Sequence, residues 1–272
     1  MGDSIKLCIE SIMMQINNEY EVIVVNDGSR DNTDFVLQQM KAQYSNITYV
    51  YLKRSRIRKL GFTRNYSFQI ARGDWCIFHI DADDLIGHYL PQFVLLVESL
   101  DSSFPNGSLY AGKQIHMAKK EFLISKGPFR NIYRGEDRDF HERLIQAGSW
   151  ILIDHKPFIS RIPRSNIINA KKTVRDVIDQ TINDMRKSKS IIQFLVYTWK
   201  IRKNFGTKIF LFKFIIAPYA IFRTKTLGYL SPNLVSNSDF TLYRDNNTKT
   251  YSNWCKDLGI SRNKSVSHEI FY

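Results

Sequence analysis

Two continuous apolar runs, each followed by acidic residues, constrain the fold of this chain more than any other feature. The first run is Val22–Val25, with Asp27 two residues beyond it, and the second is Trp75–Ile80, with Asp81 directly after it. Such runs are typical of parallel strands that are buried on both faces. Stretches with apolar residues at helical spacing precede and separate them. This alternation predicts an α/β fold with a doubly wound, mostly parallel sheet, whose ligands bind beyond the carboxyl ends of the strands.

The elements predicted around the two runs are short and closely spaced. Glycines just past two of the helices, Gly73 and Gly148, are typical helix ends. The final fifty residues are polar and rich in turn residues, and their sequence predicts no element. The predicted helices are 5–13, 34–44, 58–72 and 136–147, a longer one starts near Lys171, and the other predicted strands are Ile47–Leu52 and 150–155.

The positive charge of the chain is concentrated in one segment. The formal net charge is +13, yet residues 1–100 carry 10 Lys and Arg against 12 Asp and Glu. Residues 156–225 carry 16 against 3 and account for the whole excess. A basic block is either a solvated helix face or a surface for an acidic partner such as phospholipid, a lipid phosphate or nucleic acid. A nucleic-acid partner is not expected, because no recognised binding motif accompanies the charge.

The basic segment also has the apolar spacing of a helix. Residues 161–272 are therefore predicted to form a basic, amphipathic helical extension with a polar C-terminus. No run reaches the ~18 apolar residues of a spanning helix; the nearest, 209–222, contains Lys213 and Pro218. Basic residues alternate with aromatic ones, which predicts a helix lying in the interface of an anionic membrane. The alternative is that these apolar residues pack onto the rest of the fold. The residues concerned are Lys200, Arg202, Lys203, Lys208 and Lys213, with Trp199, Phe205, Phe210 and Phe212.

The chain opens without an apolar run behind a basic start, so no signal peptide is expected. Its three cysteines, Cys8, Cys76 and Cys255, are scattered, and no spacing indicates zinc or a disulfide framework. These features favour a cytoplasmic protein, peripheral at the cytoplasmic face of the membrane.

The acids that follow the two apolar runs are candidates for ligand binding. Asp27 can accept a hydrogen bond from a base or a ribose hydroxyl. Asp81 and Asp83 lie two residues apart, and such a pair suits a hard divalent cation that bridges to substrate phosphates. The alternative for each site is an Asp-rich turn with capping duties.

Three segments resemble, in order, the motifs of the family 2 glycosyltransferases with the GT-A fold. They are EVIVVNDGSRDNT, GFTRNYSFQIARGDWCIFHIDADDLI and RGEDRDFHERLIQAG. The corresponding family patterns are close to VVDDGSxDxT and ARNxGxxxAxGxxIxFLDADD, followed by an ED pair that opens a helix. The resemblance covers about residues 5–155 and implies a GT-A-like domain over residues 1–160. The family's usual first strand, similar to VSVIIPTYN, has no counterpart, because only Met1–Ser4 precede the first helix.

The resemblance implies a role for each matching residue on the donor side. Asp27 resembles the acid that binds the nucleotide base, and Arg64 resembles the basic residue on the nucleotide side. Asp81 and Asp83 match the DxD motif that reaches the ribose and the metal, which would be Mg²⁺ or Mn²⁺.

On the acceptor side, Asp137 resembles the catalytic base, and Glu136 is the alternative. The assignment makes chemical sense, because an inverting transfer needs a carboxylate to take the proton of the attacking hydroxyl. The implied reaction moves a sugar from a UDP- or GDP-sugar to an acceptor that is a lipid-linked glycan or a polysaccharide precursor. The processive QxxRW motif is absent, so polymerisation is not expected.

Two other readings of the sequence remain open. One is an inactive, truncated glycosyltransferase paralogue that binds membranes or polyanions through residues 156–225. The other is a sugar-phosphate nucleotidyltransferase, which would need a glycine-rich phosphate loop near the start, and the sequence contains none.

Overall fold

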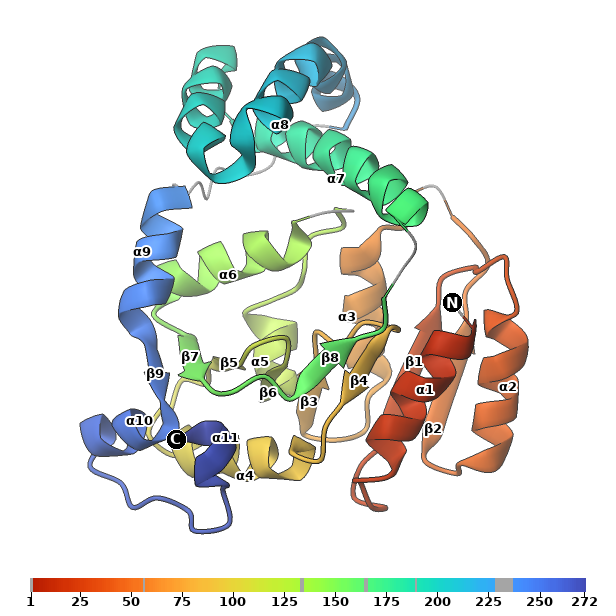
Figure 1. The fold of residues 1–272 in the computed structure, drawn as a ribbon, viewed down its shortest axis with the longest axis vertical. Coiled ribbons are helices and arrows are strands. Elements are labelled where there is room, and N and C mark those ends of the chain that lie inside the picture. The colour runs from red at the N-terminus through yellow and green to blue at the C-terminus, as the bar shows by residue number, and fades with distance from the viewer. Residues whose placement is uncertain (1, 56, 133–134, 164–165, 189, 228–236) are drawn as a thin grey trace.

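In the part of the chain that the structure describes, helices and three β-sheets make up the fold (Figure 1), and the predicted α/β class is confirmed. The computed structural model describes residues 2–55, 57–132, 135–163, 166–188, 190–227 and 237–272. The strands are β1 (Val22–Asn26), β2 (Ile47–Tyr51), β3 (Trp75–Phe78), β4 (Asp84–Ile86), β5 (Leu109–Ala111), β6 (His116–Lys119), β7 (Trp150–Asp154), β8 (Ile159–Arg161) and β9 (Thr248–Thr250). The helices are α1 (Gly2–Met13), α2 (Thr33–Gln43), α3 (Leu60–Ile70), α4 (Leu90–Asp101), α5 (Lys120–Ser125), α6 (Glu136–Ala147), α7 (Asn166–Lys187), α8 (Ile191–Leu227), α9 (Asn237–Asn247), α10 (Tyr251–Leu258) and α11 (His268–Phe271).

The first sheet consists of β1 and β2, which run parallel from the pair Val22 and Ile47 to the pair Asn26 and Tyr51. Helices α1 and α2 pack beside it, and Ile9, Leu37 and other buried residues form a small core of its own. The apolar run of β1 forms a strand as predicted, but its residues are only partly buried. Both faces are nonetheless covered: Val22 and Val24 pack against this small core, and Ile23 packs against the separate core that contains Phe68 and Leu109.

The second sheet has five strands in the order β3-β6-β5-β7-β9. The β3–β6 and β6–β5 pairs are antiparallel, whereas β5–β7 and β7–β9 are parallel. Strand β3 does not pair with β1, so the two acid-bearing strands belong to different sheets. The end of the chain, for which the sequence predicted no element, completes this part of the fold: Tyr251 and Phe271 are fully buried in the core beneath α4.

The third sheet is the short antiparallel pair of β4 and β8, in which Asp84 lies opposite Arg161. Helix α1 fixes this pair through its side chains. The hydroxyl of Ser11 accepts a hydrogen bond from the Ile86 N–H at 3.1 Å, and Gln15, two residues past the helix, donates one to the Ile86 carbonyl at 3.3 Å. The β4–β8 pair therefore has a defined position beside the end of β3, from which the chain enters it.

Helices α7 and α8 lie against each other beyond α6, on the side away from β9 and the C-terminus (Figure 1). Phe194 and Ala220 of α8 are fully buried in their interface, together with Ile182 and Met185 of α7. Gly206, with φ 76° and ψ 158°, interrupts the helical backbone of α8. Helices α7 and α8 of the predicted extension therefore form a packed pair, whereas its C-terminal part joins the five-stranded sheet and the core around Tyr251.

The cation predicted at Lys213 does not reach the surface. Its side chain is 1% exposed, and its Nζ lies 2.9 Å from Asp184 Oδ2 of α7. Pairing with a carboxylate across the helix interface is what allows this charge to be buried. The side chains of Lys200, Arg202, Lys203 and Phe205 lie outside the described part of the structure. Within the described residues, none of the helices has both the length and the apolar character that crossing a bilayer requires.

Candidate functional site

The turn after β3 carries three carboxylates with very different exposure. The side chain of Asp81 is 49% exposed, whereas Asp83 and Asp84 are buried. Asp84 accepts a hydrogen bond from the backbone N–H of Asp81 at 2.8 Å. This bond closes the turn and holds the Asp81 carboxylate outward. Asp84 thus has a structural role that the sequence motif did not reveal.

Arg161 on β8 reaches all three carboxylates. Its Nη2 lies 2.7 Å from Asp81 Oδ2, and its Nε lies 3.0 Å from Asp84 Oδ1 and 4.0 Å from Asp83 Oδ1. The β4–β8 pairing brings this residue to the site from 77 positions away. No local pattern around Arg161 indicated this contact, because it depends on the pairing of two three-residue strands.

The acid cluster raises the pKa of a neighbouring thiol. Burial, followed by the carboxylates of Asp84, Asp83 and Asp81, raises the pKa of Cys8 to about 12. The Cys8 thiol donates a hydrogen bond to the Asp81 carbonyl at 3.5 Å. The carboxylates thus disfavour a further negative charge at the thiol even though Arg161 is present. The negative potential of these carboxylates favours the binding of a cation beside them.

The residues present fit a divalent cation that is shared with a substrate. Carboxylate oxygens are suitable ligands for Mg²⁺ and Mn²⁺. The described residues contain no group of three or more His, Cys, Asp or Glu side chains arranged to hold a metal by themselves. Such a group is not required, because Mg²⁺ is commonly bound by one or two carboxylates together with substrate phosphates. Asp81 and Asp83 are the residues that would hold the ion.

Helix α6 begins with the Glu136-Asp137 pair, and the two carboxylates have different surroundings. The side chain of Glu136 is 4% exposed, and its Oε1 lies 3.3 Å from Nη2 of Arg64 on α3. Arg64 also contacts His79, with 3.5 Å between its Nη1 and the ring Nδ1, and lies over the Phe129 ring. Arg64 therefore joins α3 to α6 and lies next to Glu136.

Asp137 is half-buried and accepts a hydrogen bond from the N–H of Arg138 at 2.7 Å. Burial opposes its charge, whereas the Arg138 N–H and the Arg64 guanidinium favour it, and the pKa of Asp137 is lowered. The described residues provide it with no ion pair. Asp137 is therefore a charged carboxylate whose second oxygen can accept a proton from a bound hydroxyl.

A stack of aromatic rings lies beneath these carboxylates. The ring centroids of His79 and His116 are 4.4 Å apart, those of His116 and His141 are 5.0 Å apart, and Trp150 stacks on His141 at 4.6 Å. Burial lowers the pKa of His141 to about 3 and lowers the pKa of His79 and His116 as well. The three imidazole rings are therefore uncharged at neutral pH, and they pack together with Trp150.

His79 connects the two acidic sites electrostatically. Burial and Arg64 lower its pKa, while the carboxylates of Asp137 and Asp81 act to raise it. Both carboxylates therefore lie close enough to influence one imidazole. His79 also contacts Arg64, which pairs with Glu136, so the turn after β3 and the start of α6 lie near each other.

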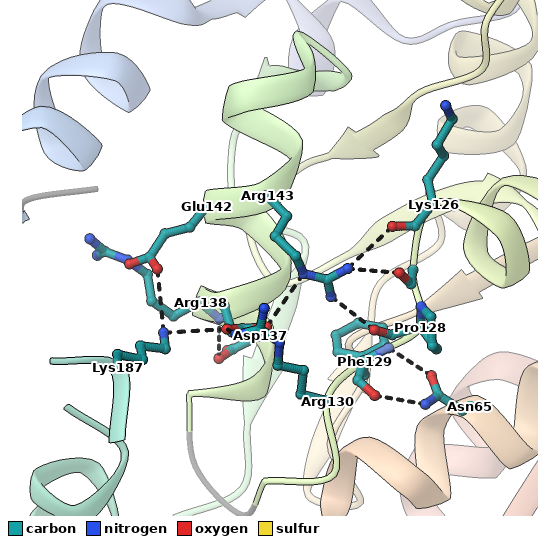
Figure 2. A network of polar contacts seen from close by, with 12 residues as sticks. Asn65, Lys126, Pro128, Phe129, Arg130, Asp137, Arg138, Glu142, Arg143 and Lys187 are labelled. Atoms are coloured by element: carbon teal, nitrogen blue, oxygen red, sulfur yellow. Dashed lines mark hydrogen bonds and ion pairs between the residues drawn. The ribbon is translucent and has the colours of Figure 1, made fainter. Parts of the chain in front are cut away.

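Hydrogen bonds to the preceding loop hold α6 in place (Figure 2). The guanidinium of Arg143 donates to the carbonyls of Gly127 and Pro128 at 2.7 and 2.8 Å. Asn65 of α3 exchanges two hydrogen bonds with the backbone of Phe129, at 2.8 and 2.9 Å. Because both the loop and α3 are fixed, the position of Asp137 relative to Arg64 is fixed as well.

The extension contacts the same helix through Lys187, the last residue of α7. Its Nζ lies 3.3 Å from Glu142 Oε2 and 3.6 Å from Asp139 Oδ1 (Figure 2). All three side chains are buried. Burial raises the pKa of Glu142, although Lys187 and Arg138 act in the opposite direction. Helix α7 is thus joined to the helix that carries Asp137.

Asp27 lies in the turn after β1, and Thr63 of α3, the neighbour of Arg64, donates a hydrogen bond to its Oδ2 at 3.5 Å. Its side chain is 34% exposed, and its Oδ1 accepts a hydrogen bond from Arg58 Nε at 2.7 Å. Gly28 follows with φ 73°, and a Cβ there would meet the Arg54 backbone at 2.8 Å. The turn after β1 therefore requires glycine. Arg58, rather than Arg64, is the basic residue that the structure places beside Asp27.

An α/β fold with an acid-rich turn after β3 and an acidic pair opening α6 defines a GT-A-like protein. Residues 2–160, more than half of the chain, match the profile of Glycosyl transferase family 2. The chain belongs to this family.

Curated relatives match over limited segments. The poly(ribitol-phosphate) beta-glucosyltransferase of Bacillus spizizenii is 35% identical over 88 residues, which cover 31% of this chain and 13% of that protein. The chondroitin synthase of Escherichia coli is 26% identical over 153 residues, covering 54% of this chain and 21% of that protein. The matched segments thus span a small part of these longer proteins.

One solved structure matches almost the whole fold. The mannosyltransferase PcManGT from Pyrobaculum calidifontis, in complex with GDP-Man and Mn²⁺, has a TM-score of 0.53 and is 14% identical. The match covers 95% of this chain and 81% of that chain. At this level of identity it supports the GT-A-like fold.

Proposed function

We propose that this protein transfers a sugar from a nucleoside diphosphate sugar to an acceptor hydroxyl, with inversion at the anomeric carbon. The donor would be a UDP- or GDP-sugar, and the acceptor a glycan or a lipid-linked glycan. The proposal agrees with the family of the chain and with the transferases to which it is similar.

The observation that carries the proposal is that Glu136 and Asp137 have different surroundings. Glu136 is buried and pairs with Arg64, whereas Asp137 is half-buried and charged. A catalytic base must reach the acceptor hydroxyl and must be unprotonated at the working pH. Asp137 meets both requirements better than Glu136.

The other residues would bind and orient the donor. Asp27 would accept hydrogen bonds from the nucleotide base, and Asp81 and Asp83 would hold Mg²⁺ or Mn²⁺. When bound, such an ion neutralises the negative charge of the departing diphosphate. Arg64, which contacts both Glu136 and His79, would hold the start of α6 in a fixed position relative to the residues that bind the donor.

We expect Asp83→Asn to abolish the metal-dependent part of donor binding, because an amide is a much weaker ligand for a hard cation than a carboxylate. Calorimetry with UDP, GDP and their sugars, with Mn²⁺ and with EDTA, measures this effect. Asp74→Asn, at an exposed position, is the matched control, and circular dichroism checks that the buried substitution is folded. Equal donor binding with Mn²⁺ and with EDTA in the unaltered protein would contradict the metal role.

A second function, binding without transfer, is favoured by one observation: β1, which precedes Asp27, is not hydrogen-bonded to the sheet that contains β3. An inactive paralogue would bind membranes or polyanions through its basic segment. It would show no turnover with any donor that binds, whereas the transferase would turn that donor over.

We further propose that α8 attaches the protein to the surface of an anionic membrane. Several large apolar side chains on this helix are well exposed, among them Trp199 at 55%, Ile215 at 75% and Phe222 at 62%. Lys208 and Lys225 of the same helix are also exposed. Apolar and aromatic residues beside cations are typical of helices that lie in the membrane interface. Each cation near such a surface contributes about 1 kcal/mol, so the attachment should be sensitive to salt.

We expect the double variant Ile215→Ser/Phe222→Ser to lose most of its binding to anionic vesicles. The substitutions remove exposed apolar area and leave the buried α7–α8 interface intact. Co-sedimentation with phosphatidylserine-containing and neutral vesicles, at low and high salt, measures this loss. The matched control is Phe35→Ser/Ile57→Ser, with side chains 63% and 83% exposed outside the extension. The membrane proposal is wrong if the unaltered protein stays in the supernatant with anionic vesicles at low salt.

A further inference from the structure

Arg161 lies where the proposed cation site and the donor diphosphate would meet. It pairs with Asp81, the most exposed of the three acids, at 2.7 Å, and its own side chain is 42% exposed. A guanidinium that neutralises these carboxylates also competes with any other cation for them. Its position therefore bears directly on how the site would accept a metal and a diphosphate.

The two ends of the guanidinium are held differently. Its Nε donates to Asp84 Oδ1, and Asp84 is fully buried and bonded to the Asp81 backbone. Its Nη2 donates to the exposed Asp81 carboxylate. The inner contact is shielded from water, whereas the outer contact is open to it. Exposed ion pairs contribute little to stability, so the outer contact can be exchanged at small cost.

Guanidinium groups suit phosphate oxygens. Arginine offers several N–H donors in a planar fork, which bind phosphate oxygens through charge-assisted hydrogen bonds. An arginine that is fixed through Nε keeps its Nη atoms available for such a ligand. The direction of the fork is already set by Asp84 and by the β4–β8 pairing.

We propose that Arg161 is an exchangeable counterion of the acid cluster and a binding residue for the donor diphosphate. Without ligand, its Nη2 neutralises Asp81. With Asp81 engaged as a ligand of a divalent cation, Nη2 would bind the diphosphate oxygens while Nε stays on Asp84. This inference rests on the proposed function, because it assumes a nucleoside diphosphate donor.

Removing the charge of Arg161 should change the affinity for Mn²⁺ and the affinity for the diphosphate in opposite directions. Arg161→Met keeps most of the side-chain stem and removes the guanidinium. The affinity for Mn²⁺ alone should rise several-fold, because Asp81 loses its competitor. The affinity for UDP or GDP in saturating Mn²⁺ should fall about tenfold, the loss expected for one charge-assisted hydrogen bond. Binding of uridine and guanosine, which lack phosphates, should not change.

The experiment is calorimetry on the whole chain with MnCl₂ alone, with UDP and GDP in saturating Mn²⁺, and with the two nucleosides. Manganese binding is also read by electron paramagnetic resonance. Arg72→Met is the matched control, because Arg72 pairs with Glu21 at the surface and is 76% exposed. Arg161→Lys, which keeps the charge, should restore part of the diphosphate affinity.

The possible outcomes separate this inference from the proposed function. If the unaltered chain binds UDP or GDP and Arg161→Met changes neither Mn²⁺ nor diphosphate affinity, the role of Arg161 is wrong and the proposed function stands. A fall in diphosphate affinity without a rise in Mn²⁺ affinity overturns the exchange, since a structural role alone gives that result. If the unaltered chain binds no nucleoside diphosphate, the proposed function fails, and this inference fails with it.

Discussion

Replacement of Asp137 with Asn is expected to slow sugar transfer by about 10²–10⁴-fold, the usual contribution of a general base. The amide has the shape of the carboxylate, and its oxygen can still accept the hydrogen bond from the Arg138 N–H. It cannot take up the proton of the acceptor hydroxyl. Donor affinity should stay unchanged, because the base acts on the acceptor.

Initial rates with a verified donor and acceptor, combined with calorimetry of donor binding, measure the two effects separately. Glu136→Gln is the matched control at the neighbouring position. It removes the charge that pairs with Arg64 and should lower the stability of the α3–α6 contact more than the rate of the chemical step. If Asp137→Asn keeps full turnover while Glu136→Gln loses it, the base is Glu136.

The pH dependence of the rate provides an independent check of this assignment. The pKa of Asp137 is held below its usual value, and burial lowers the pKa of His141 to about 3. Asp137 is thus deprotonated, and His141 neutral, throughout the neutral range. The rate should therefore show no acidic limb near the ordinary pKa of histidine. A fall in rate centred near pH 6.5 would instead point to an imidazole as the base.

Replacement of Asp139 with Ala is expected to destabilise the fold by about 3–5 kcal/mol, the cost of breaking a buried ion pair on one side. Asp139 is fully buried, and three cations surround its carboxylate. Arg130 lies at 2.9 Å, Arg143 at 3.4 Å and Lys187 at 3.6 Å. Without the carboxylate, these charges are left in a poorly hydrated interior, where Lys187 keeps its contact with Glu142.

Urea denaturation followed by circular dichroism measures the loss of stability. The control is Asp245→Ala, which removes an exposed pair with Arg244 and should cost no more than about 1 kcal/mol. An effect of Asp139→Ala as small as the control would show that the three cations are hydrated or find other partners. A loss of this expected size is a large fraction of the ~5–15 kcal/mol that typically stabilises a folded domain.

The sequence predicted the local elements of this fold well, and its long-range pairings less well. Helix α6 begins and ends at the predicted residues 136 and 147 because an acidic first turn and Gly148 mark its ends. Strand β9, a three-residue polar segment, has no such pattern. Its place beside β7 is decided by burial of the residues that follow it, such as Tyr251.

The same limit applies to the candidate site. The order of the motifs predicted that Asp81 and Asp137 belong to one site, which stays a prediction; Arg64 joins the two segments through its contacts with His79 and Glu136. The contact of Arg161 with the acids could not be predicted, because it depends on a pairing between distant short strands. The burial of Lys213 was missed for a related reason: its partner Asp184 lies on another helix.

Because the β1–β2 pair is separate from the five-stranded sheet, the region around Asp27 can open at a free energy of its own. The β1–β2 pair has its own small core and is not hydrogen-bonded to the five-stranded sheet. A two-stranded sheet is marginal by itself, so this region is expected to open at a lower free energy than the rest of the domain. Asp27 would lose its position in each opening. A nucleotide that contacts Asp27 would bind only the closed form, and its binding energy would then stabilise this subdomain as well as hold the donor.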